Sequence, residues 1–366
     1  MLRIDKPCLL NKQAVVYQHL NIPKIMNKLR FAAFGTGFWS HFQLPAWYEL
    51  DNVECVSLYN RTLSKAQVLA EKIGNPTCYD DPRELLANEQ LDFVDILTDV
   101  DTHLHFTKMA AEKGLHVVCQ KPMASNYEDA QKLVEVCKAN QVKLFINENF
   151  RWQAPLRRVK EIVASNAIGE VFKGRISFSS AFPVFDNQPF LAELDQFILT
   201  DVGSHILDIC RFLMGEAQTL HCEIQTVNPK IKGEDVANVF MKMRSGAHCY
   251  AEMSYASILE KEVFPQTLVL LEGSAGSVRL DPDFKIVTTT REGSVTEEVK
   301  PQMYDWVDPE YAVVHSSIVD AQRDILNGMR GGKAETTGED NFETVKLVWA
   351  SYHSAATGQI IHLDNF

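Results

Sequence analysis

A lysine whose direction is set by the chain is the first chemical feature of this sequence. The segment "VVCQKPM" at positions 117–123 places Lys121 at the end of an apolar run and directly before Pro122. Proline restricts the residue before it to extended conformations, so the backbone fixes where the lysine points. An ammonium held in this way can donate a hydrogen bond to a substrate hydroxyl or carbonyl oxygen. A solvated surface lysine is the alternative.

A histidine close to two carboxylates is the second feature. In "TDVGSHILD", Asp201 and His205 are four residues apart, so on a helix they share one face, and Asp208 follows a turn later. A carboxylate neighbour fixes the tautomer of a histidine and stabilises the imidazolium, which makes the pair a good general base near neutral pH. The alternative is an aspartate that caps the helix beside a histidine that packs against a sheet.

A glycine-rich turn, "GTGFWS", follows the first apolar run and precedes a helical segment. Gly35 permits the tight turn, Gly37 lets the backbone approach a pyrophosphate, and the helix N-terminus supplies unpaired N–H groups. The pattern predicts a dinucleotide site, although an ordinary turn between a strand and a helix also uses glycine.

The end of the second apolar run affects the choice between NAD and NADP. The chain reads Tyr59-Asn60-Arg61-Thr62 there, without the acidic residue that binds the ribose 2′-hydroxyl of NAD. Asn60 cannot accept hydrogen bonds as a carboxylate does, whereas Arg61 can pair with a 2′-phosphate or stack on adenine. The segment therefore favours NADP slightly. If Arg61 is instead a solvated loop residue, it does not contact the cofactor, so both NAD and NADP remain possible.

Alternating apolar runs and helical segments position these residues. Strand-like runs cover 29–35, 53–60, 92–98, 115–120 and 142–148, and segments with a period of 3.6 residues lie between them. This order predicts parallel βαβ units in a doubly wound sheet, and therefore an α/β protein with an N-terminal Rossmann dinucleotide-binding domain over 29–148. Lys121 and the glycine-rich turn fall at the carboxyl edge of that sheet, where such folds bind ligands.

The pattern changes after Arg151. A helical segment leads into long strand-like runs joined by turn signals such as Ser245-Gly246, with two further helices near the end of the chain. This predicts a C-terminal α+β domain over 149–366 with a large, mostly antiparallel open sheet. Residues 1–28 are expected to be an N-terminal extension.

Composition and charge exclude several classes of protein. The chain is 46% hydrophobic and 23% charged, which is typical of a soluble globular protein. A net charge of −12 without a dense basic run argues against a nucleic-acid partner. The eight cysteines are widely spaced with no Cys-x-x-Cys pair, so we expect reduced thiols in a cytoplasmic protein and no metal site. No apolar run is long enough for a membrane span.

In chain order, the segments "GTGFW", "YNRT", "LTDVDTH", "CQKP", "INENFRW" and "DVGSH" resemble the motifs of the Gfo/Idh/MocA oxidoreductases, over about 29–360. The resemblance implies an NAD(P)-dependent dehydrogenase that oxidises a hydroxyl of a monosaccharide or polyol. Some segments are similar to the aldose 1-dehydrogenase branch, which implies an aldose such as D-apiose. The resemblance to the family further implies that the domain over 149–366 binds substrate and forms oligomers. There are two alternatives. One is a glycosidase that oxidises and re-reduces its sugar with bound NAD, and the other is a non-catalytic sensor of dinucleotide and sugar.

The resemblance also implies roles for individual residues. Lys121, Asp201 and His205 match the catalytic positions, and the same three, with Asn149, are expected to contact the substrate. The expected cofactor contacts are Gly35, Thr36, Gly37, Phe38, Trp39, Asn60, Arg61, Thr98, His103, Gln120, Lys121, Arg151 and Trp152. Two positions depart from the family: Asp99 replaces a proline, and Gln120 replaces a glutamate beside the nicotinamide site.

A loop before Asp201 supplies further expected substrate contacts. It carries Asp186 and Gln188 among the aromatic residues Phe182, Phe185 and Phe190. Aromatic faces together with amide and carboxylate groups suit a sugar, which presents both C–H faces and hydroxyls. The alternative is that the aromatic residues belong to the core. For the open face of the second sheet, the resemblance suggests pairing between copies, in a homodimer or homotetramer.

Overall fold

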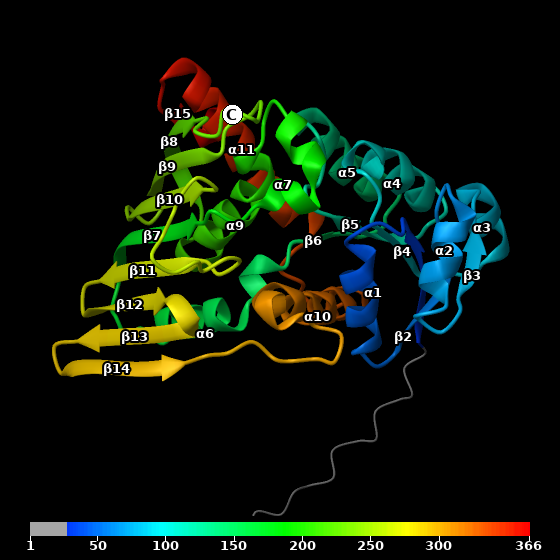
Figure 1. Cartoon of the computed structure of the whole chain (residues 1–366), viewed down its shortest axis with the longest axis horizontal. Helices are drawn as coiled ribbons and strands as arrows, with labels where there is room; N and C mark the ends of the chain where they lie inside the picture. The colour runs from blue at the N-terminus through cyan, green and yellow to red at the C-terminus, as the bar shows by residue number, and fades with distance from the viewer. Residues whose placement is uncertain (1–27) are drawn as a thin grey trace, which may run out of the picture.

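The first part of the chain forms a six-stranded parallel sheet with helices on both faces (Figure 1). The computed structural model describes residues 28–366, so all but the last residue of the expected N-terminal extension lies outside the described residues. The strand order is β3-β2-β1-β4-β5-β6. The strands are β1 (Leu29–Phe34), β2 (Val53–Tyr59), β3 (Thr77–Tyr79), β4 (Phe93–Ile96), β5 (His116–Gln120) and β6 (Leu144–Asn147). The helices are α1 (Ser40–Tyr48), α2 (Leu63–Ala70), α3 (Pro82–Asn88), α4 (His103–Ala111) and α5 (Tyr127–Ala139).

Burial explains the parallel arrangement of this sheet. Every residue of β4 and of β6 is buried, as expected when helices cover both faces of a strand. One face packs on α3, α4 and α5 and the other on α1 and α2. The predicted Rossmann architecture is therefore confirmed.

The second part of the chain builds a nine-stranded sheet in the order β14-β13-β12-β11-β7-β10-β9-β8-β15. The strands are β7 (Val171–Ser179), β8 (Ala217–Gln225), β9 (Val236–Met243), β10 (His248–Ser254), β11 (Leu268–Gly273), β12 (Gly276–Asp281), β13 (Lys285–Thr290), β14 (Gly293–Glu298) and β15 (Ile361–His362). Only β7 and β10 pair in parallel among these strands, which confirms a mostly antiparallel sheet.

Helices cover one face of this second sheet and leave the other open. The covering helices are α6 (Ala154–Ala164), α9 (Gly203–Met214) and α11 (Gly338–Thr357). Burial alternates along β9 and β10, with Phe240 and Tyr250 on the exposed face. The short helices α7 (Val184–Asn187) and α8 (Ile198–Asp201) lie in the loop between β7 and α9.

The last two long helices return to the first sheet. Helix α10 (Ala312–Met329) packs against α1 and β6, and α11 packs against α5 and β6. Figure 1 shows α10 in orange between the second sheet and α1.

No helix in the described part of the chain is both long and apolar enough to cross a membrane. The seven cysteines of this part are all free, and Cys8 lies outside it.

Candidate active site

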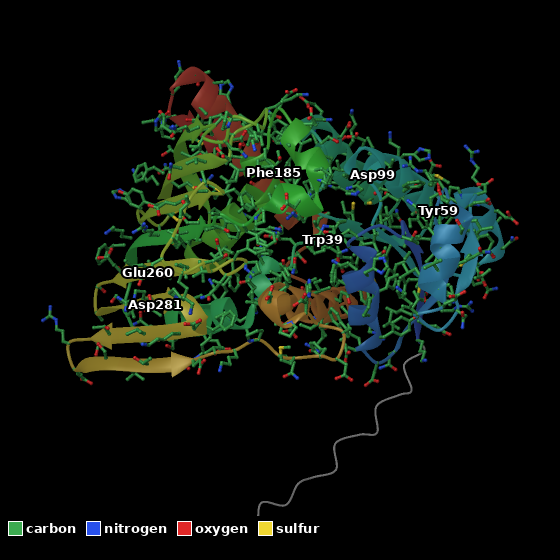
Figure 2. All side chains as sticks on the ribbon, viewed as in Figure 1. Trp39, Tyr59, Asp99, Phe185, Glu260 and Asp281 are labelled. Atoms are coloured by element: carbon green, nitrogen blue, oxygen red, sulfur yellow. The ribbon has the colours of Figure 1, made fainter. Side chains whose placement is uncertain are left out.

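A cleft of about 260 Å³ lies between the two sheets and brings the predicted catalytic residues together. Lys121 reaches it from the end of β5, Asp201 from α8 and His205 from α9. Trp39, labelled near the middle of the molecule in Figure 2, borders it from the start of α1. A larger, more open hollow of about 540 Å³ near the C-terminus contains none of these groups, so we place the chemistry in the smaller cleft.

Lys121 is oriented by Asp201. Its Nζ lies 3.1 Å from Asp201 Oδ1 and 3.3 Å from the Asp201 carbonyl oxygen, and both side chains are mostly buried. An ammonium has three donors, so one remains for an oxygen in the cleft. Tyr255 lines the cleft beside this pair, and burial, reinforced by the negative charge of Asp201, holds the pKa of Tyr255 well above its usual value.

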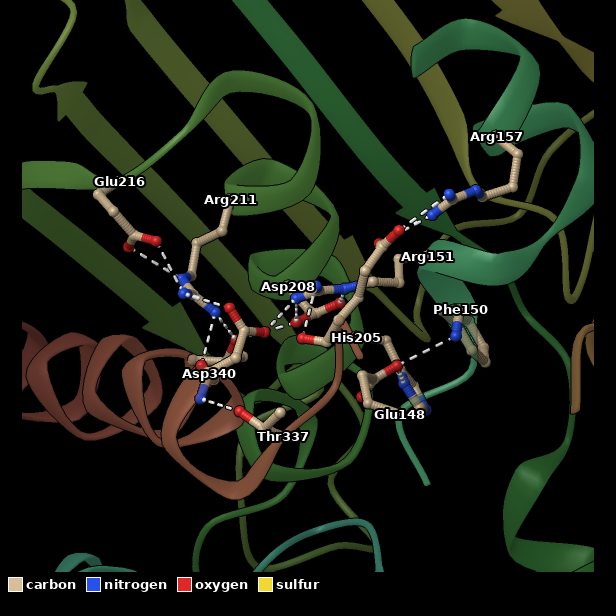
Figure 3. A network of polar contacts seen from close by, with 12 residues as sticks. Glu148, Phe150, Arg151, Arg157, His205, Asp208, Arg211, Glu216, Thr337 and Asp340 are labelled. Carbon is tan, nitrogen blue, oxygen red and sulfur yellow. Dashed lines mark hydrogen bonds and ion pairs between the residues drawn. The ribbon is translucent and has the colours of Figure 1, made fainter. Parts of the chain in front are cut away.

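His205 is held by a carboxylate that the sequence analysis did not identify. Its Nδ1 donates to Oε1 of Glu148 at 2.6 Å, and Glu148, directly after β6, is 0% exposed (Figure 3). The Phe150 N–H donates to the same oxygen at 3.1 Å, and the Phe150 ring stacks on the imidazole with centroids 3.7 Å apart. This arrangement leaves Nε2 as the free ring nitrogen for the cleft that His205 lines.

Glu148 stays ionised despite its burial. Burial acts to raise the pKa of Glu148, but the charge of His205, its hydrogen bond and the Phe150 N–H outweigh this and lower the pKa overall. The carboxylate beside His205 is therefore Glu148, not Asp201 as the four-residue spacing predicted. The sequence signal was an acidic residue at the carboxyl end of a buried strand.

Arg151, one of the expected cofactor contacts, belongs to a network of polar contacts (Figure 3). Arg151 donates to Asp208 from Nε at 2.7 Å and from Nη2 at 2.5 Å, and it also pairs with Asp340 at 2.8 Å. The Trp152 ring lies under Arg157, 4.2 Å from its guanidinium carbon. Neither side chain lines the cleft, and their contact with the cofactor stays a prediction. Arg151 lies where it does because the buried charge of Asp208 requires a cation.

Asn149 and His103 also have internal partners. Asn149 donates to the Val314 carbonyl at 3.0 Å and to the Ser317 hydroxyl at 2.8 Å, which ties the end of β6 to α10. The ring nitrogens of His103 lie 3.1 Å from the Thr98 carbonyl oxygen and 3.3 Å from that of Met123. His103 thus holds the backbone near Lys121 and is buried, whereas a cofactor contact was expected.

The glycine-rich turn fits a dinucleotide. Gly35 has φ +104°, and a Cβ there would lie 2.8 Å from the Leu97 backbone, so only glycine is accommodated. A Cβ at Gly37 would meet nothing within 4 Å, which leaves room for a phosphate. Thr36 Oγ1 and Gln120 Nε2 are buried polar atoms with no hydrogen-bond partner among residues 28–366. These two atoms are available for a bound cofactor.

The other predicted contacts divide between the cleft and the surface. Asn60 and the exposed Arg61 follow β2 at the carboxyl edge, and Asn60 Nδ2 donates to the Thr62 carbonyl at 3.0 Å. Thr98 follows β4, and its Oγ1 accepts from Thr102 Oγ1 at 2.7 Å. Phe38, like Trp39, lines the cleft.

The loop before Asp201 contributes only part of what was expected. Gln188 and Phe182 line the cleft, whereas Asp186 is exposed and does not line it. Phe185 packs on the core, and Phe190 is solvent-exposed. The aromatic residues of this loop are therefore partly cleft wall, partly core and partly surface.

The chain belongs to the Gfo/Idh/MocA oxidoreductases. The model of the oxidoreductase family with an NAD-binding Rossmann fold matches residues 29–148, and that of the Gfo/Idh/MocA C-terminal domain matches residues 156–279. The protein is thus an oxidoreductase with a dinucleotide-binding domain, and the resemblance inferred from the sequence is confirmed.

Individual relatives cover nearly the whole chain. The D-apiose dehydrogenase of Rhizobium rhizogenes is 37% identical over 92% of this chain and 98% of that protein. The D-apiose dehydrogenase of Paraburkholderia graminis is 38% identical over 93% of this chain and 91% of that protein. A crystal structure of an oxidoreductase from Agrobacterium radiobacter in complex with NAD+, L-tartaric acid and magnesium has a TM-score of 0.90, 36% identity, and coverage of 93% of this chain and 99% of that chain.

Proposed function

We propose that the protein is an NAD(P)-dependent aldose dehydrogenase, with D-apiose or a closely similar sugar as its substrate. The observation that carries the proposal is the presence at one cleft of the Lys121–Asp201 ion pair at 3.1 Å and the hydrogen bond of 2.6 Å from His205 Nδ1 to Glu148 Oε1. A non-catalytic sensor has no need of a buried carboxylate behind a cleft histidine. The sugar itself is suggested by the D-apiose dehydrogenases that resemble this chain over most of its length.

In this proposal the chain binds the sugar and removes one proton. Lys121 donates a hydrogen bond to the reacting hydroxyl oxygen, and His205 Nε2 takes the proton of that hydroxyl. The hydrogen on the carbon leaves with two electrons as hydride, the C–O bond becomes a carbonyl, and oxidation at the anomeric carbon gives a lactone. Bound NAD(P)+ supplies the hydride acceptor. Glu148 remains ionised and stabilises the imidazolium until His205 returns its proton to solvent.

The test is the absorbance of reduced nicotinamide when purified protein is mixed with NAD+ or NADP+ and a panel of D-apiose, D-xylose, D-glucose and myo-inositol. We expect sugar-dependent reduction with the highest kcat/KM for D-apiose. Lys121→Met, which keeps the length of the side chain, should lower kcat by roughly 10²- to 10⁴-fold. Lys132→Met on the exposed face of α5 is the matched control and should behave as wild type.

Two results would overturn the proposal. Reduction that is equal in Lys121→Met and in wild type would remove Lys121 from the chemistry. A flat trace with every sugar, together with hydrolysis of glycosides and retention of the cofactor on mass spectrometry, would indicate the redox-neutral glycosidase instead.

We further infer that the protein is a homodimer or homotetramer in the cytoplasm. Phe240 and Tyr250 lie side by side on the open face of the second sheet, with ring centroids 5.1 Å apart, and a second copy would bury them. Light scattering of wild type and of Tyr250→Glu tests this: we expect the oligomer to dissociate in the variant. A wild-type mass equal to that of one chain would contradict it.

A further inference from the structure

His315 lines the cleft but has no role in the proposed catalytic mechanism. It comes from α10, far along the chain from Lys121 and His205, yet it lines the same cavity of about 260 Å³. Helix α10 is anchored against α1 of the first domain, so the position of His315 is fixed relative to the glycine-rich turn that precedes α1.

One ring nitrogen of His315 has no hydrogen-bond partner in the described part of the chain. The side chain is 5% exposed, and Nδ1 is buried without a hydrogen-bond partner among residues 28–366. Buried nitrogen atoms are almost always paired, because leaving one unpaired is costly. An unpaired nitrogen in the wall of a ligand cleft is therefore a candidate ligand contact.

Aromatic neighbours hold the imidazole in one orientation. The Phe42 ring stacks on it with centroids 4.1 Å apart and an interplanar angle of 21°. Tyr311 lies at 5.7 Å and Trp306 at 6.4 Å from it. Burial lowers the pKa of His315 to about 4 and outweighs the opposing charge of the nearby Asp308. At neutral pH the ring is uncharged, so it offers one donor and one acceptor.

This chemistry suits a hydroxyl of an uncharged sugar. A hydroxyl both donates and accepts, as a neutral imidazole does, and the aromatic walls suit C–H faces. Charged residues around the cleft are one lysine and two aspartates, and Lys121 is already paired with Asp201, so a carboxylate substrate would meet excess negative charge. The cleft therefore favours a neutral aldose over a sugar acid.

We propose that His315 is the specificity-determining residue of the cleft, which binds a sugar hydroxyl away from the reacting carbon. The proposal rests on the proposed function in that the ligand is a sugar. His315 takes no part in the proton transfer, so its contribution is to substrate selection and not to the chemistry.

The test combines one protein change with changes in the sugar. His315→Phe keeps the ring stacking and the volume but removes both nitrogen atoms. We expect kcat/KM for the preferred aldose to fall on the order of 10- to 100-fold, as for loss of one buried hydrogen bond, mainly through KM. Among monodeoxy analogues of that aldose, one should show equal kcat/KM for wild type and variant, because it lacks the hydroxyl that His315 binds.

Controls separate this inference from folding and from the proposed function. His353→Phe on α11 is the matched change at an exposed helical histidine and should behave as wild type. Calorimetric titration of the same sugars into protein saturated with NADH measures binding without turnover, and NADH affinity should be equal in both proteins. If wild type binds sugar without oxidising it, and His315→Phe weakens that binding, the inference stands while the proposed function fails.

Two outcomes would overturn the inference. Unchanged sugar affinity and kcat/KM in His315→Phe, with an unchanged melting temperature, would exclude a contact. An equal loss for every deoxy analogue would show that His315 shapes the cleft without binding a particular hydroxyl. Where His315→Phe fails to fold, His315→Asn, which keeps a donor and an acceptor on a shorter side chain, is compared with the same analogues.

Discussion

The charge of Glu148 can be removed with little change in the shape of the site. In Glu148→Gln, Oε1 keeps the hydrogen bonds from His205 Nδ1 and the Phe150 N–H. The new amide nitrogen replaces Oε2, which has no hydrogen-bond partner within residues 28–366. What the variant loses is the attraction between a carboxylate and the imidazolium that forms when His205 takes the substrate proton.

The expected loss follows from the strength of that attraction. Hydrogen bonds to charged groups contribute roughly 1.5–3 kcal/mol and neutral ones roughly 0.5–1.5 kcal/mol, a difference of about 1–2 kcal/mol. Two unit charges about 4 Å apart at an effective dielectric constant of about 20 attract by about 4 kcal/mol, which is the upper limit. Since about 1.4 kcal/mol corresponds to tenfold in rate, we expect kcat to fall on the order of 10²-fold, between the two limits.

Steady-state kinetics of sugar-dependent NADH formation measures this loss. KM for the sugar should change much less than kcat, because Glu148 does not line the cleft. The solvent deuterium isotope effect on kcat should increase, since proton transfer becomes more limiting. Glu216→Gln, which alters an exposed partner of Arg211 away from the cleft, is the control and should keep the wild-type kcat. Wild-type turnover in Glu148→Gln would refute the reasoning.

Three further predictions concern cofactor binding and stability. In Gly35→Ala the added Cβ would press on the Leu97 backbone, which introduces roughly 1–3 kcal/mol of strain. We therefore expect a lower affinity for NAD+ in calorimetric titration and a lower melting temperature. An unchanged titration would contradict this. Burial raises the pKa of Asp95 to about 7, so the folded state binds more protons than the unfolded state between about pH 4 and pH 7, and unfolding free energy falls as pH rises through that window. Asp95→Asn should lack this pH dependence, so its free energy of unfolding, measured with urea, should rise relative to that of wild type by up to about 4 kcal/mol as the pH increases. Parallel curves of unfolding free energy against pH would exclude the effect. Asp208→Asn should cost up to about 3–5 kcal/mol in the same unfolding assay, because it leaves the buried Arg151 to pair with the more exposed Asp340 in place of the fully buried Asp208, and a loss below about 1 kcal/mol would contradict that role.

The fold was predictable because its signals are local. The glycine at position 35 follows an apolar strand and opens a helix, and the covered strands are continuous apolar runs. Three strands were not predicted: β3, β14 and the two-residue β15, which is too short to show any periodicity. β3 has three residues, and β14, "GSVTEE", is polar and exposed at the edge of the second sheet, so hydrophobic periodicity does not mark either of them.

The partners within the site were less predictable because they are distant in sequence. His205 and Glu148 are 57 residues apart, and Arg151 meets Asp208 across the same interval. The spacing of Asp201 and His205 placed both at the cleft, but helix periodicity cannot show which carboxylate faces which nitrogen. His315 carries no local signal, because its isolation from hydrogen-bond partners follows from tertiary packing alone.

Helix α10 makes the first sheet depend on residues that are synthesised well after its last strand, β6. Ile325 and Leu326 of α10 belong to the same buried cluster as Phe31 and Trp47 of the first domain. Because the ribosome releases the chain from its N-terminus, the part of this face that α10 covers stays exposed after α1 and α2 have already packed on the rest. His315 reaches the cleft at the same stage, so a nascent or truncated chain that lacks α10 exposes apolar surface on the sheet and also has an incomplete cleft wall.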